Sequence, residues 1–157
     1  MKLDATDQQI LNLLQSDASL AVAEIADRVN LSQPPCWRRI KRLEEAGFIN
    51  ARVALLNRRE LGLNLVTYIE IKLSANRRAE VSEFEHQIRA FPEVTECYLI
   101  AGRADFLLRV VTRDVDAYER FYRDHLSLLP GLEDITSFVA MSEVKYTTEL
   151  PLAQSFS

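Results

Sequence analysis

The sequence predicts an α+β chain in two parts, and three observations support this prediction. The first 50 residues show apolar side chains at helical spacing, separated by turn-forming residues. After residue 62, strand-like and helix-like patterns follow in the order strand, helix, strand, strand, helix, strand. Residues 57–62 between them are polar and charged, which is typical of a hinge. The chain has 157 residues, 48% of them hydrophobic and 27% charged, which argues against disorder and leaves room for two small cores.

The first part opens with two predicted helices. Asp4 is placed to cap the first helix, and Asp7 adds negative charge near its positive end. Three apolar side chains share the inner face of this helix: Ile10, Leu13 and Leu14. The second helix covers about residues 21–29, and Asn30 after it tolerates the left-handed conformation that a tight break requires.

A third helix follows after a three-residue turn. Ser32 is placed to cap it, and Pro34 and Pro35 fall in its first turn, where a missing N–H group costs little. Gly47 is its expected end. Two helices joined in this way form a helix-turn-helix. Residues 48–56 then predict a small wing that leads into a strand.

The second part predicts a ferredoxin-like βαββαβ sandwich with both helices on one face of the sheet. The expected elements are a strand over 63–73, a helix over 77–91, strands over 94–101 and 105–111, a helix over 115–129 and a strand over 132–146. The second of these helices is expected to bury Val115, Tyr118, Tyr122, Leu126 and Leu129. Apolar side chains also alternate onto the other face of the strands, so we expect a second copy of the chain to cover that face in a homodimer.

Composition excludes several classes of protein. The chain has two cysteines, Cys36 and Cys97, and two histidines, too few for a disulfide scaffold or a zinc site at the usual spacings. Its four glycines are scattered, so no phosphate-binding loop is expected. No nucleophile, base and orienting group come together, and we therefore predict no enzyme, no metal and no cofactor. The start of the sequence is unlike a signal peptide and no apolar run suits a membrane helix, which favours the cytoplasm.

Charge is distributed unevenly along the chain. The net charge is −4, but residues 1–60 carry +1 and residues 61–157 carry −5. Residues 38–59 hold seven basic residues and two acidic ones. Such a local positive patch suits a polyanionic partner despite the negative total.

The third helix concentrates this charge on its outer face. A helical projection turns Cys36, Ile40 and Leu43 towards the core and the basic side chains away from it. Basic groups can reach guanine edges or phosphates in the major groove of double-stranded DNA, and Gln33 can read adenine. The expected DNA contacts are Ser32, Gln33, Trp37, Arg38, Arg39, Lys41 and Arg42. The alternative is an ordinary solvated basic face, which the turn and the exposed Trp37 disfavour.

Residues 32–44, SQPPCWRRIKRLE, resemble the recognition helix of the Lrp/AsnC (leucine-responsive/asparagine-operon) family of transcriptional regulators. Shorter segments elsewhere are similar to the same family, at 3–7, 54–56, 101–105, 130–132 and 144–146. Residues 145–151 with Cys36 and Trp37 resemble a branch that contains a cysteine-responsive regulator of cysteine breakdown. The resemblance implies a helix-turn-helix domain over 1–52, a hinge strand and linker over 53–62, an effector-binding and oligomerisation (RAM) domain over 63–146 and a tail over 147–157.

The resemblance also implies an amino acid effector, with cysteine, leucine or methionine as candidates, bound between subunits. Carried over to this sequence, the effector site comprises Gly102, Arg103, Asp105, Ser137, Phe138 and Val139. The resemblance further implies dimers that assemble into tetramers, octamers or hexadecamers, with double-stranded DNA as a partner, in the cytoplasm with the nucleoid. Two positions depart from the family pattern: Pro34 replaces a common Ser or Thr in the first turn, and Ala101 replaces one before the glycine.

Two other functions remain open from the residues alone. An architectural protein that wraps DNA would need no effector. A metabolite-binding module or small enzyme on the ferredoxin-like scaffold would need no operator. An effect of amino acids on DNA binding separates the first from a regulator, and an absence of sequence-specific binding would favour the second.

Overall fold

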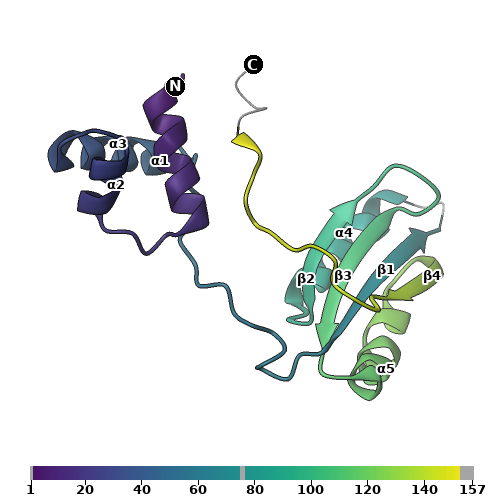
Figure 1. The fold of residues 1–157 in the computed structure, drawn as a ribbon. Helices are drawn as coiled ribbons and strands as arrows, with labels where there is room; N and C mark the ends of the chain where they lie inside the picture. The colour runs from purple at the N-terminus through teal and green to yellow at the C-terminus, as the bar shows by residue number, and fades with distance from the viewer. Residues whose placement is uncertain (1, 75–76, 153–157) are drawn as a thin grey trace. The chain divides into compact units, whose positions relative to one another are not determined.

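The computed structural model describes residues 2–74 and 77–152, which fold into two compact units (Figure 1). One unit comprises Met1–Leu55 together with the chain from Lys145 onward, and the other is Leu56–Val144. Among the described residues, no helix is both long and apolar enough to cross a membrane. Each unit has its own hydrophobic core.

The N-terminal unit contains three helices: α1 (Ala5–Ser16), α2 (Val22–Arg28) and α3 (Gln33–Glu45). Their inner faces form one core of buried side chains: Ile10, Leu11, Leu14, Ile25, Ala26, Val29, Cys36, Ile40 and Leu43. Leu11 takes the buried place expected of Leu13, which is only partly buried. Asn30 has a φ of 55°, which confirms the left-handed residue expected at the turn between α2 and α3.

The strand and wing expected over residues 48–56 do not form. These residues follow α3 without strand pairing, and Leu55 and Leu56 are largely exposed. A strand is stable only beside another strand, and the described part of this chain offers none there. The hinge strand expected over 53–62 is therefore absent, although the chain does turn at residues 58–62.

The described end of the chain packs against the N-terminal unit instead of forming a separate tail. The side-chain amide of Gln15 donates to the carbonyl oxygen of Leu150 at 3.1 Å, and its oxygen accepts from the N–H of Leu150 at 2.9 Å. Leu152 packs against the helical core. The unit is thus built from two segments that are far apart in the sequence.

The second unit is an antiparallel four-stranded sheet in the order β2-β3-β1-β4. The strands are β1 (Leu65–Leu73), β2 (Val94–Leu99), β3 (Phe106–Thr112) and β4 (Leu132–Val139). The central strand β1 pairs with both β3 and β4, so that Ile69 lies opposite Leu108 on one side and Ser137 on the other. This arrangement confirms the expected ferredoxin-like order.

Helices cover one face of this sheet. The covering elements are α4 (Arg77–Ala90), α5 (Val115–Asp124) and a short 3-10 helix η1 (Leu126–Leu128). Their apolar side chains join those of the strands in a second core: Ile69, Ile71, Leu73, Phe84, Ile88, Phe106, Leu108, Val110, Phe121, Leu126 and Leu129.

The helix expected over 115–129 is shorter and buries different residues. It stops at Asp124, because His125 takes φ −133° and ψ −64° and the chain continues as η1. Phe121 is buried in place of the expected Tyr122, and Val115 is exposed. The expectation assumed one continuous helix in which all five apolar side chains share a face. The break at His125 turns Leu126 and Leu129 relative to α5, so that a different face of α5 packs against the core.

β4 is also shorter than the strand expected over 132–146. It ends at Val139, and beyond it Met141 and Val144 are fully exposed. The N–H of Ala140 still donates to the carbonyl oxygen of Val66, which lies one residue from the beginning of β1 at Leu65.

The second face of the sheet has no helix over it. Tyr98 of β2, Tyr68 of β1 and Phe138 of β4 point to this face and are exposed. Ion pairs lie beside them, including Arg103 with Glu70. The face is therefore partly apolar and partly charged.

Candidate functional site

The outer face of α3 carries the side chains that the sequence assigned to DNA binding. The inner face is fixed in the core by Cys36, Ile40 and Leu43. The predicted residues that remain exposed are Ser32, Gln33, Trp37, Arg38, Lys41 and Arg42, and Arg39 is partly buried. Trp37 is 51% exposed, an unusual position for a large apolar side chain.

Ser32 occupies the N-cap position of α3, but its hydroxyl makes no capping hydrogen bond. A cap normally accepts from the backbone N–H of the second or third helical residue. Here these are Pro34 and Pro35, which have no N–H. The backbone carbonyl of Ser32 accepts from the N–H of Cys36 at 3.3 Å, so the helix still begins there. The hydroxyl of Ser32 is not used for capping.

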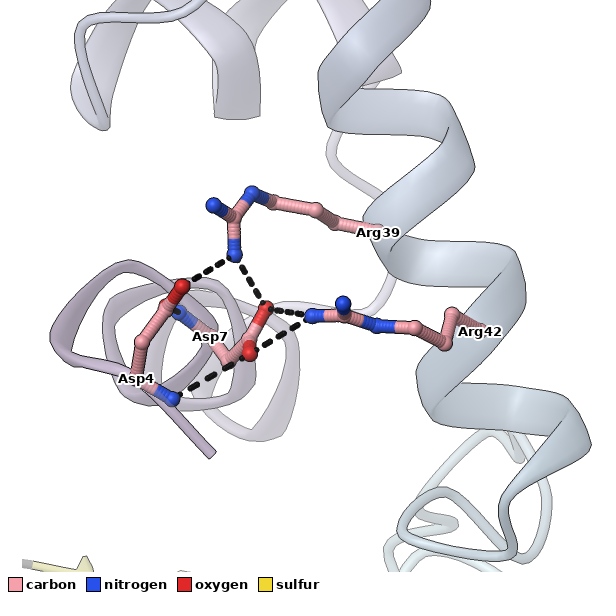
Figure 2. Close-up of polar contacts among 4 residues, drawn as sticks. All are labelled: Asp4, Asp7, Arg39 and Arg42. Atoms are coloured by element: carbon pink, nitrogen blue, oxygen red, sulfur yellow. Dashed lines mark hydrogen bonds and ion pairs between the residues drawn. The ribbon is translucent and has the colours of Figure 1, made fainter. Parts of the chain in front are cut away.

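Two of the predicted DNA-binding arginines are held by carboxylates of α1 (Figure 2). One guanidinium nitrogen of Arg39 donates to Asp4 at 2.7 Å and to Asp7 at 2.8 Å. Arg42 donates to both carboxylate oxygens of Asp7, at 2.9 and 2.8 Å. The side chain of Asp7 is only 1% exposed, whereas Arg39 is 28% and Arg42 48% exposed. The network therefore ties α3 to α1 and leaves part of each guanidinium facing solvent.

The same carboxylates also cap α1. The N–H of Asp7 donates to Asp4 at 2.8 Å, and the N–H of Asp4 donates to Asp7 at 3.3 Å, which confirms the expected cap. The N–H of Asp7 and the guanidinium of Arg39 lower the pKa of the Asp4 carboxyl below its ordinary value. Hydrogen bonds to Asp4 and Asp7 raise the pKa of Arg39. Sequence reasoning recognised the cap but missed the contacts with α3, because the partners lie 32 to 35 residues apart.

Within the described residues, Arg38 is the basic residue of α3 that has no ion-pair partner. Lys41 lies 3.3 Å from Glu44, and Glu44 also accepts from Arg52 at 2.9 Å. Arg38 is exposed, and its position on the helix turns it away from the core. Its five donors are therefore available to an external acceptor.

Two shallow hollows lie on either side of Arg38. One, of about 400 Å³, is mainly apolar and is lined by Val22, Gln33, Pro34, Trp37 and Arg38. The other, of about 260 Å³, is lined by Pro35, Arg38, Arg39 and Arg42. The surface of α3 thus offers an apolar contact and a cationic contact side by side.

The predicted effector residues form two separate groups within one chain. In the loop before β3, Gly102 has a φ of 154°, which favours glycine. Arg103 donates to Glu70 through two nitrogens, at 2.9 and 2.7 Å. The carboxylate of Asp105 accepts from the N–H of Leu73 at 2.8 Å, so one of its acceptor positions stabilises the end of β1.

The second group lies at the other end of β1. The hydroxyl of Ser137 bonds to that of Tyr118 on α5 at 2.5 Å. Phe138 lies opposite Tyr68 on the uncovered face, and Val139 lies opposite Thr67. Thr67 lies four residue steps along β1 from Ile71, whose carbonyl accepts from the N–H of Asp105, a span of about 13 Å at the usual rise of a strand. One chain therefore does not bring the two groups together.

The two cysteines lie in different surroundings, but the pKa of each thiol is raised above its ordinary value. Cys36 is buried in the helical core, as expected, and burial raises the pKa of its thiol. Cys97 is an exposed residue of the edge strand β2, where desolvation and the charge of Glu85 raise the pKa of its thiol. In the described part of the chain, no group of three His, Cys, Asp or Glu side chains is arranged to hold a metal ion.

Comparison with known proteins matches both units. Residues 3–50 match the winged helix-turn-helix DNA-binding family, and residues 66–150 match the Lrp/AsnC ligand binding domain. The chain belongs to the Lrp/AsnC family. It is 39% identical over 150 residues to the DNA-binding transcriptional activator DecR of Escherichia coli K12, covering 96% of this chain and 99% of that one.

Two further relatives are similar over most of the chain. The chain is 41% identical to the proline dehydrogenase transcriptional activator of Rhodobacter capsulatus, covering 90% of this chain and 92% of the relative. A transcriptional regulator of Neisseria meningitidis, solved in complex with L-Met, superposes with a TM-score of 0.93 at 36% identity, covering 96% of this chain and 97% of that structure. This member of the Lrp/AsnC family is thus a DNA-binding transcriptional regulator with a ligand-binding domain.

Proposed function

We propose that the chain binds specific sites on double-stranded DNA through the outer face of α3, and that an amino acid changes this binding. The observation that carries the DNA-binding part is the exposed Arg38, which has no ion-pair partner among the described residues and lies beside Trp37. An arginine in this position can donate two hydrogen bonds to a guanine edge.

The predicted DNA contacts divide into two groups by their geometry. Ser32, Gln33, Trp37, Arg38 and Lys41 are exposed and contact DNA in the proposal. Arg39 and Arg42 use some of their N–H donors in hydrogen bonds to Asp4 and Asp7. In the proposal, their remaining exposed donors contact phosphates. Phosphate contacts supply affinity that falls with salt, whereas base contacts supply sequence preference.

The proposed effector site is shared between two copies of the chain. Gly102, Arg103 and Asp105 supply one part, and a second part comprises Ser137, Phe138 and Val139. Their separation within one chain supports a site at an interface. The ligand class is an amino acid, with its ammonium on Asp105 and its carboxylate on backbone N–H groups. Cysteine, leucine and methionine are the candidates, and L-Met is bound in the Neisseria relative.

The other parts of the proposal rest on membership of the Lrp/AsnC family and on the uncovered sheet face. The chain acts by binding and not by catalysis, forms dimers that assemble into tetramers or octamers, and works in the cytoplasm with the nucleoid. Residues 1–52 bind DNA, 53–62 link the domains, and 63–146 bind the effector and other copies. Residues 147–157 form the C-terminal tail, of which the described part packs on the N-terminal unit.

A titration with DNA from upstream of the chain's own gene tests this function. Trp37, the only tryptophan, reports binding by its fluorescence, at two salt concentrations and with a panel of amino acids. We expect saturable, sequence-dependent binding that weakens with salt and shifts with one amino acid. Arg38→Ala should lower the affinity for the specific site by about tenfold to a hundredfold. Arg120→Ala, which removes an exposed arginine from α5, is the matched control and should bind normally.

Each other outcome points to a different function. Specific binding that no amino acid shifts would remove the effector and favour an architectural protein. Normal specific binding by Arg38→Ala would show that α3 does not read DNA as proposed. A lack of sequence-specific binding at this and other promoters would contradict the proposal as a whole.

A further inference from the structure

We propose that the apolar hollow beside Trp37 receives the 5-methyl group of a thymine in the major groove. The chain would then prefer thymine to uracil or cytosine at one position of each half-site. This inference rests on the proposed function, because it assumes that α3 enters the major groove. It adds a specific base and a specific group on that base to the proposed contacts.

The hollow lies at the end of α3 that meets base edges in a helix-turn-helix. Its walls come from the beginning of α2, at Val22, and from the first turns of α3, at Pro34 and Trp37. In such motifs the N-terminal residues of the second helix contact the bases, while the first helix crosses the backbone. In the proposal, the walls from α3 place the hollow at the base edges, and Val22 of α2 closes it on the side of the DNA backbone.

The chemistry of the walls suits a methyl group better than a hydrogen-bonding edge. Pro34 and Pro35 remove two backbone donors from the first turn of α3. The lining is mainly apolar, and the side chains of Gln33 and Arg38 contribute its polar part. In the major groove, the thymine methyl is the apolar group that distinguishes one base from the others.

Charge argues for DNA as the occupant rather than an apolar segment of a protein. Arg38 lines both the apolar hollow and the neighbouring hollow with Arg39 and Arg42. A polyanion can therefore place a phosphate at the cationic hollow while a base edge meets the apolar one. A hydrophobic peptide would leave Arg38 desolvated without an acceptor, which is unfavourable.

Uracil substitution tests the proposal, because uracil keeps every hydrogen-bonding group of thymine and lacks only the methyl. A specific site is first selected from a pool of random duplexes. Each of its thymines is then replaced singly by uracil, and binding is measured by the anisotropy of labelled DNA. We expect about a fourfold loss of affinity at one thymine of each half-site, the size implied by burial of one methyl group. Thymines in the flanking duplex outside the selected site are the control, and their replacement should cause no loss of affinity.

Two variants locate the effect in the hollow. Trp37→Ala removes its largest wall, and Val22→Thr keeps the shape of the side chain but replaces a methyl with a hydroxyl. Both should bind thymine and uracil duplexes with nearly equal affinity. Lys41→Ala, one turn further along α3, should weaken binding to both duplexes by the same factor. Thermal unfolding followed by circular dichroism verifies that each variant is folded.

The outcomes separate this inference from the function on which it rests. If no specific site is selected, both fail. If a site is selected but no uracil substitution changes the affinity, the regulator remains and the methyl contact is wrong. If the preference for thymine persists in Trp37→Ala and Val22→Thr, the methyl is read elsewhere and the assignment to this hollow is overturned.

Discussion

Asp7 is a buried side chain that joins α1 to α3. Its buried carboxylate accepts hydrogen bonds from both Arg39 and Arg42. Asp7→Ala should lower the free energy of unfolding by about 2–4 kcal/mol, less than for a fully buried ion pair because both guanidinium groups still reach solvent. Urea unfolding followed by circular dichroism measures this loss.

A double-mutant cycle with Arg42→Ala isolates the contact between the two side chains. Once Asp7 has been removed, the second substitution should cost little more, so the two losses should not add. A coupling energy below about 0.5 kcal/mol would show that Arg42 and Asp7 stabilise the unit independently.

Asp4 makes the stability of the N-terminal unit depend on pH. Its pKa in the folded chain lies below the ordinary 3.8, so the folded state favours the ionised carboxylate. As the pH falls, the unfolded chain therefore takes up the proton first. The contribution of the Asp4 carboxylate to the free energy of unfolding is complete above about pH 5, declines as the pH falls through about 4, and is lost below the lowered pKa. Asp4→Asn keeps a capping oxygen but loses the charge, and should flatten the decline of stability with acid in urea unfolding at successive pH values.

Two related variants complete that experiment. Arg39→Gln should flatten the decline only in part, because the N–H of Asp7 still lowers the pKa of Asp4. An unchanged pH profile for Asp4→Asn would mean that other carboxylates account for the loss of stability in acid.

The caps of α1 and α3 should respond differently to the same change. Asp4→Ala removes the hydrogen bond from the N–H of Asp7 and the ion pair with Arg39, and should lower the free energy of unfolding by about 1–2 kcal/mol. Ser32→Ala should lower the free energy of unfolding by less than about 0.5 kcal/mol, because Pro34 and Pro35 have no N–H that could donate to the Ser32 hydroxyl. Thermal and urea unfolding compare the two variants, and equal losses would contradict this account of the α3 cap.

The sequence predicts the positions of these elements better than their lengths. Apolar spacing, proline and glycine place the helices and the antiparallel strands correctly, because these signals are local. The break at His125 has no such signal: the apolar pattern of 115–129 is continuous, while aromatic packing of Phe91 and Phe121 against the His125 ring accompanies the change to η1. The early end of β4 likewise depends on where its partner β1 begins.

The candidate site shows the same limit. Helical projection places Arg38 opposite the core and Trp37 on a flank of α3, and both side chains are exposed in the structure. The same projection cannot show that Arg39 and Arg42 meet Asp4 and Asp7, since these contacts depend on how α1 packs against α3. A pair of acidic residues and a pair of arginines on separate helices gives no local pattern from which to predict the pairing.

The uncovered face of the sheet predicts how the chain behaves in solution. Tyr98 and Phe138 are exposed on this face, and a second copy would remove them from water. Tyr98→Glu with Phe138→Glu should therefore reduce the mass measured by sedimentation towards that of one chain. Leu128→Glu, at an exposed position of η1 outside this face, is the control and should keep the wild-type mass. A double variant that keeps it too would place the interface elsewhere.

The packing of Leu150 and Leu152 on the first helices has a consequence for the order in which the protein is made. The ribosome completes Ala5–Ser16 early, but Leu150, which bonds to Gln15, is synthesised only after every residue of Leu56–Val144. Domains generally fold as units during translation, from the N-terminal end. The recognition helix can therefore pack into its core early, whereas the last contacts of its unit form only after the C-terminal residues have been synthesised. A ribosome that stops short of Leu150 releases a chain whose DNA-binding unit lacks these closing contacts.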